Sequence, residues 1–101
     1  MNDAISSAIG FSMKAGKCVA GAFSVEKAIK SGNAKLIALD SNISENSRKS
    51  FLAMVKGVIP MIDVPNLGRC IGKDGKMAAA VVDLGFANMI LNAQKKLNGG
   101  L

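Results

Sequence analysis

Two short, unbroken apolar runs constrain the fold of this chain more than any other feature of its sequence. Residues Leu36–Leu39 and Met77–Val82 contain no polar side chain and have the length of a strand. A strand without polar residues is typical of a sheet that is covered on both faces, because neither set of alternating side chains meets water. We therefore expect central strands with helices on either side of them.

The rest of the chain alternates between helical and strand-like patterns. Further strands are predicted at Cys18–Ala20 and Ile59–Ile62, and Pro60 places the latter at the sheet edge or marks the strand's start. Helical spacing of apolar residues, together with caps and glycines, predicts helices over 3–15, 24–31, 45–56, 66–71 and 85–97. Strands separated by helices favour parallel pairing. The prediction is one α/β domain over residues 1–101, a three-layer α/β/α sandwich around a four-stranded, mostly parallel or mixed sheet.

The composition narrows the classes of function. The chain has no His, which removes the commonest general base and metal ligand and excludes Ser-His and Cys-His nucleophile pairs. Asp40, Asp63 and Asp83 lie at strand ends, where α/β enzymes place working carboxylates, but each is explained by a turn or a helix cap. We expect no catalytic residue, no metal site and no cofactor, and the chain is not expected to be an enzyme.

The charge balance points to a polyanionic partner. The chain carries 13 Lys and Arg against 7 Asp and Glu, a net charge of +6, which suits nucleic acid or an anionic membrane face. No apolar run approaches the roughly 18–20 residues of a membrane-spanning helix, and the first residues lack the basic start of a secretory signal. Two cysteines, Cys18 and Cys70, are too few for a disulfide framework. We expect a cytoplasmic protein with no membrane partner.

The basic residues form two groups along the sequence. One group lies in a stretch whose only acidic residue is Glu26, and it comprises Lys14, Lys17, Lys27, Lys30 and Lys35. The other group surrounds two glycines and comprises Arg69, Lys73 and Lys76. If the ends of the first and last strands meet, the loops near Gly21 and Gly72 form one basic edge, with Phe23 as its aromatic residue.

The glycine pair of the second group leaves one alternative open. The sequence Ile71-Gly72-x-x-Gly75 is similar to the Gly-x-x-Gly loop of KH domains, which clamps single-stranded nucleic acid. A KH loop joins two helices. The apolar run after Gly75 favours a strand, but the alanines at 78–80 keep a helix possible. A KH-type single-strand binder would require that helix.

Several segments resemble the kink-turn-binding ribosomal proteins of the L7Ae and L30e type. The opening of the chain is similar to these proteins over Ile9–Lys17, at Gly21 and over Val25–Leu36. Later segments resemble the small bacterial, YlxQ-like members of the family, and they are Ser44–Ser47, Leu67–Lys73 and Val81–Ala87. The segments follow the same order over nearly the whole chain. The resemblance implies the same α/β/α sandwich.

The resemblance also implies a function. The family binds kink-turns, which are sharp RNA bends built on tandem sheared G·A pairs, and it reads them after the first strand with roughly Gly-x-Asn-Glu-x-x-Lys. Gly21 and Lys27 match the ends of that motif, and the segment 72–77 occupies a second contact loop. Phe23 and Ser24 stand where the family often has Asn and Glu, whose side chains read guanine edges. Phe can stack on a base but cannot form those hydrogen bonds.

The predicted function is a non-enzymatic RNA-binding protein of the ribosomal type, expected to be a monomer. Its partner is structured RNA, with ribosomal RNA as a candidate, recognised more through backbone shape than through base edges. The predicted RNA-binding residues are Lys17, Gly21, Ala22, Phe23, Ser24, Lys27, Lys30, Arg69, Gly72, Lys73 and Lys76. A protein-interaction scaffold that has lost RNA recognition is the alternative that Phe23 and Ser24 would permit.

Overall fold

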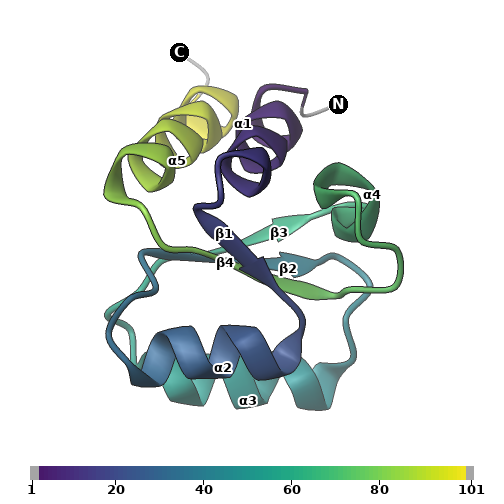
Figure 1. Ribbon diagram of the computed structural model, residues 1–101, viewed down its shortest axis with the longest axis vertical. Coiled ribbons are helices and arrows are strands. Elements are labelled where there is room, and N and C mark those ends of the chain that lie inside the picture. The colour runs from purple at the N-terminus through teal and green to yellow at the C-terminus, as the bar shows by residue number, and fades with distance from the viewer. Residues whose placement is uncertain (1–2, 100–101) are drawn as a thin grey trace.

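Helices cover both faces of a four-stranded sheet in the computed structural model, which describes residues 3–99 (Figure 1). Helices α1, α4 and α5 lie on one face, and α2 and α3 lie on the other. This arrangement confirms the predicted α/β/α sandwich with a mixed sheet. The elements in chain order are α1 (Asp3–Lys14), β1 (Cys18–Ala20), α2 (Ala22–Lys30), β2 (Leu36–Asp40), α3 (Glu45–Val55), β3 (Met61–Val64), α4 (Leu67–Ile71), β4 (Ala78–Val81) and α5 (Leu84–Gly99).

The two apolar runs form the two central strands, since the strand order is β1-β4-β2-β3. Every residue of β2 and β4 is buried. Along β2, Leu36 and Ala38 belong to the core under α1, α4 and α5, whereas Ile37 and Leu39 belong to the core over α2 and α3. Successive side chains of a strand point to opposite faces, so one apolar strand supplies both cores. The sequence pattern therefore predicted the layers correctly.

Of the two arrangements that the sequence left open, mostly parallel and mixed, the strand pairings show the mixed one. Strands β2 and β3 pair in parallel, while β4 runs antiparallel to both β1 and β2. The length of α4 explains the reversal. A helix of five residues rises about 7.5 Å, whereas a strand of five residues spans about 17 Å. After α4 the chain is still at the end of the sheet where β2 and β3 finish. Strand β4 therefore begins there and runs in the opposite direction.

The starts of β3 and α2 move by two residues from their predicted positions, and so do the ends of β3 and α5. The strand expected at Ile59–Ile62 begins at Met61, because Pro60 has no N–H to donate and contributes only its carbonyl, which accepts a 2.9 Å bond from the Ile37 N–H. As Pro60 predicts, β3 lies at an edge of the sheet. Helix α2 begins at Ala22 rather than Ser24, since Gly21 forms its N-cap with a φ of 96°.

A buried carboxylate links the end of β2 to the start of α4. The side chain of Asp40 accepts hydrogen bonds from the Asn42 N–H, 2.8 Å from Oδ1, and from the Leu67 N–H, 3.0 Å from Oδ2. It fixes both the turn after β2 and the position of α4. As predicted, Asp83 caps α5, with its Oδ2 2.9 Å from the Phe86 nitrogen. Within residues 3–99, no helix combines the length and the apolar character that crossing a membrane requires.

Candidate nucleic-acid interface

Three loops meet where β1 and β2 end and β4 begins (Figure 1). They are the β1–α2 corner at Gly21–Ala22, the β2–α3 loop at 41–44 and the α4–β4 loop at 72–77. We call these three loops together the loop edge. Residues from all three line an open hollow of about 520 Å³. The loop edge is therefore a continuous surface built from segments that are far apart in the sequence.

The closest approach between the first and third loops is at Gly21. Its N–H donates a 2.8 Å hydrogen bond to the carbonyl of Ala78, and the ammonium of Lys76 lies 3.4 Å from the place where a Cβ would stand. The φ of 96° is one that side-chain-bearing residues rarely adopt. Glycine thus permits the turn into α2, and the Lys76 ammonium lies close over that turn.

Helix α2 begins at this corner without a side-chain cap. The Val25 N–H donates the first backbone hydrogen bond of the helix, to the Gly21 carbonyl at 2.9 Å. Over the described part of the chain, no side chain caps the N–H groups before it, and the first turn contains no acidic residue. Uncapped N–H groups and the positive end of the helix dipole favour an anion at this position.

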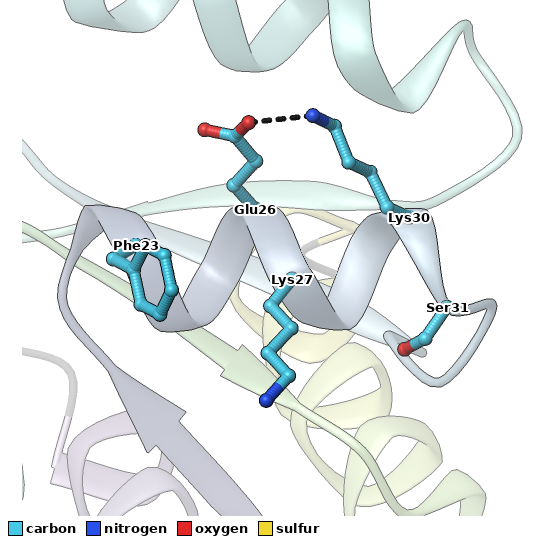
Figure 2. Close-up of a pocket in the computed structure, with 5 residues that line it drawn as sticks. All are labelled: Phe23, Glu26, Lys27, Lys30 and Ser31. Carbon is cyan, nitrogen blue, oxygen red and sulfur yellow. Dashed lines mark ion pairs between the residues drawn. The ribbon is translucent and has the colours of Figure 1, made fainter.

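Side chains of α2 extend this surface away from the loop edge (Figure 2). Phe23 is 80% exposed. Glu26 and Lys30 form an ion pair at 2.8 Å, and Lys27 points away from that pair. Ser24 and Lys27 also line a second hollow beside β1. The helix therefore presents an aromatic ring and a lysine that is not engaged by its neighbouring carboxylate.

The α4–β4 loop folds back on α4 at a second glycine. The Lys73 N–H donates a 2.8 Å bond to the carbonyl of Gly68, and a Cβ at Gly68 would lie 2.7 Å from the Lys73 carbonyl oxygen and 3.3 Å from the Gly75 nitrogen. The loop can take this path only because residue 68 has no side chain. Lys73 and Lys76 are exposed on the folded-back loop.

Over 3–99, no group of three or more His, Cys, Asp or Glu side chains is placed to hold a metal ion. Burial raises the pKa of the Cys18 thiol, which disfavours a reactive thiolate. Asp63 is an exposed carboxylate that pairs with Arg48 at 2.6 Å. The arrangement at the loop edge is suited to binding an anionic surface.

Comparison with known proteins places the chain in a family. The sequence model of the ribosomal protein L7Ae/L30e/S12e/Gadd45 family matches residues 3–91. The chain belongs to this family. The resemblance seen in the sequence is thereby confirmed.

Individual relatives agree with this assignment. The RNA-binding protein YlxQ of Bacillus subtilis (strain 168) is 34% identical over 88 residues, which cover 83% of this chain and 88% of YlxQ. A Bacillus halodurans protein of unknown function has a TM-score of 0.82 at 28% identity, covering 88% of this chain and 94% of its own. The Giardia lamblia 15.5kD RNA binding protein has a TM-score of 0.71 at 16% identity, covering 96% and 87%, a likeness of fold.

The predicted RNA-binding residues are not all in one place. Gly21, Ala22 and Lys76 line the hollow at the loop edge, and Gly72 and Lys73 belong to the loop that leads to it. Phe23, Ser24 and Lys27 follow on α2. Three others lie outside the loop edge, namely Lys17, Lys30 and Arg69.

Each of these three outlying residues has a structural reason for its position. The Lys17 carbonyl accepts a 2.9 Å bond from the Val82 N–H, so Lys17 lies at the end of β1 opposite Gly21. Lys30 is in the last turn of α2 and pairs with Glu26. Arg69 is exposed on the short helix α4.

Sequence reasoning missed the β2–α3 loop as part of this surface. Asn42, Ile43 and Ser44 line the hollow, but none of them is among the predicted RNA-binding residues. Ser44 also caps α3, because its hydroxyl accepts a 3.2 Å bond from the Ser47 N–H. The missing signal was the antiparallel pairing of β2 with β4, which places the end of one strand beside the start of the other.

The KH alternative is wrong for this chain. The glycine-containing loop at 72–75 is followed by strand β4 at Ala78–Val81 and not by a helix. The apolar run is buried on both faces of the sheet, and that burial outweighs the helix propensity of its alanines.

Proposed function

We propose that this protein binds structured RNA through the loop edge and the adjoining face of α2, and that a kink-turn is its target. One observation carries the proposal: the ammonium of Lys76 lies over Gly21, so the two loops that the family resemblance assigns to RNA contact form one cationic corner. Membership of the L7Ae/L30e family and the similarity to the RNA-binding protein YlxQ support the same conclusion.

The proposed binding rests mainly on phosphate contacts. The start of α2 offers uncapped N–H groups, and Lys27, Lys73 and Lys76 provide positive charge around it. Phosphate contacts fix the position of an RNA without reading its sequence. Phe23 and Ser24 cannot make the paired hydrogen bonds of an Asn and a Glu, so specificity depends on the shape of the bent RNA backbone.

A titration of labelled kink-turn RNA at two salt concentrations tests this function. We expect tighter binding to the kink-turn than to the same RNA with its G·A pairs disrupted. With about three to four phosphate contacts, affinity falls about 40- to 150-fold between 50 and 200 mM salt. Equal affinity for the two RNAs would contradict kink-turn recognition and leave a general attraction for polyanions.

Lys27→Ala is expected to weaken binding and to reduce the slope of log affinity against log salt by about 1. Lys27 points away from the Glu26–Lys30 ion pair and is free to contact a phosphate (Figure 2). Lys95→Ala, an exposed lysine of α5 on the other face of the sheet, is the matched control and should keep the original slope. Equal slopes for the Lys27 and Lys95 variants would remove Lys27 from the interface.

A further inference from the structure

Phe23 holds an aromatic ring in solvent next to the loop edge. Its side chain is 80% exposed, whereas Phe51, in the core over α2 and α3, is 4% exposed. Figure 2 shows the ring beside the first turn of α2, away from the ion pair of Glu26 and Lys30. Leaving a ring of this size in water forgoes the free energy that burying it would release. The ring is therefore available to a ligand.

One lysine follows this ring on α2, and another lies over the corner that precedes it. Lys27 is four residues further along α2, so it shares a helix face with Phe23. Lys76 lies over Gly21, which precedes Phe23 by two residues. Within residues 3–99, neither lysine forms an ion pair, and the nearby carboxylate of Glu26 is held by Lys30 at 2.8 Å.

We propose that Phe23 is the stacking surface for one unpaired base of the bound RNA, and that Lys27 and Lys76 contact the phosphates on either side of that base. This inference rests on the proposed function. A nucleobase has flat π-faces and a negatively charged phosphate on each flank, which match an exposed ring with one lysine after it on α2 and another over the corner before it. The ring carries no hydrogen-bond donor or acceptor, so it selects a base that is free to stack and is indifferent to which base it is.

A protein partner matches this surface less well than RNA does. The buried centre of a protein interface is depleted of charged residues, and covering two lysines beside the ring would require matching acids or cost their desolvation. RNA supplies the matching negative charge in its own backbone. The net charge of +6 favours the same partner over the whole chain.

The test combines protein variants with modified RNA. Phe23→Ala is expected to weaken kink-turn binding about 5- to 150-fold, the range for loss of one base–aromatic stack. Phe23→Tyr should bind like the original protein, whereas Phe23→Leu, which keeps apolar surface but has no ring, should bind weakly. Each unpaired nucleotide of the kink-turn RNA is then made abasic in turn. At one position, removing the base should weaken binding by the original protein. The same abasic RNA should bind the Phe23→Ala variant as well as the unmodified RNA does.

Phe11→Ala is the matched control, because Phe11 is 58% exposed but lies on α1, on the other face of the sheet. It should leave RNA affinity unchanged, and circular dichroism should show both alanine variants to be folded. If the original protein prefers the kink-turn but Phe23→Ala or Phe23→Leu binds equally well, stacking is refuted and the proposed function stands. Weaker binding without coupling to any abasic position also refutes stacking. If the original protein does not prefer the kink-turn, both proposals fail.

Discussion

Asp40→Ala is expected to lower the free energy of unfolding by about 3 kcal/mol, because it removes a charged acceptor from two hydrogen bonds in a protected position. The carboxylate is 7% exposed and accepts from the N–H groups of Asn42 and Leu67. With alanine at position 40, both N–H groups lose their hydrogen-bond acceptor. For a domain of this size the loss corresponds to a fall in melting temperature of about 12–24 °C, measurable by circular dichroism.

Asp63→Ala is the control for this prediction. Asp63 is also an aspartate of a strand, but its side chain is 56% exposed and its partner is the Arg48 guanidinium at 2.6 Å. An exposed ion pair contributes about 0–1 kcal/mol, so this variant should melt within a few degrees of the original protein. Similar melting temperatures for the two variants would contradict the structural role assigned to Asp40.

Gly68→Ala is expected to displace the α4–β4 loop and to damage RNA binding. The new Cβ would lie 2.7 Å from the Lys73 carbonyl oxygen, a backbone atom that can move only with its loop. Crowding of this kind costs about 1–3 kcal/mol of stability. Because the loop carries Lys73 and Lys76, its displacement should lower the salt slope of RNA binding by about 1–2. Chemical denaturation and RNA titration measure the two effects.

Gly57→Ala separates the binding effect from simple destabilisation. Gly57 has a φ of 73° after α3, and among the described residues nothing lies within 4 Å of the place that a Cβ would take. Alanine there is strained by about 1–2 kcal/mol, similar to the cost at Gly68, but the site is remote from the loop edge. Its RNA salt slope should not change. If the salt slope of RNA binding is unchanged in Gly68→Ala as well, the α4–β4 loop does not position Lys73 and Lys76 for RNA contact.

The layers of the fold could be predicted from the sequence because they follow from local patterns. Two apolar runs of strand length require cover on both faces, and Leu36–Asp40 receives it from helices on either side. The cap at Asp83 was equally local, since the carboxylate bonds the N–H three residues later. Such features depend on residues close together in the chain.

The directions of the strands and the extent of the loop edge depend on distant residues. The antiparallel course of β4 follows from the short length of α4. The spacing of apolar residues predicts where a strand lies but not its direction in the sheet. The bond from the Leu67 N–H to Asp40 joins residues 27 positions apart. The exposure of Phe23 is likewise a tertiary property, because a Phe at the start of a helix can face a core or solvent. Sequence patterns alone do not decide such matters.

The place of β4 in the sheet has a consequence for synthesis of the protein. Among the described strands, β1 pairs only with β4, and the Gly21 N–H is bonded to the Ala78 carbonyl next to the Ala20–Ala79 pair. A growing polypeptide therefore leaves its first strand unpaired until the fourth has left the ribosome. Nascent chains that stop short of β4 lack the corner that we propose for RNA binding. On that proposal, a chain must extend through β4 before it can bind its RNA.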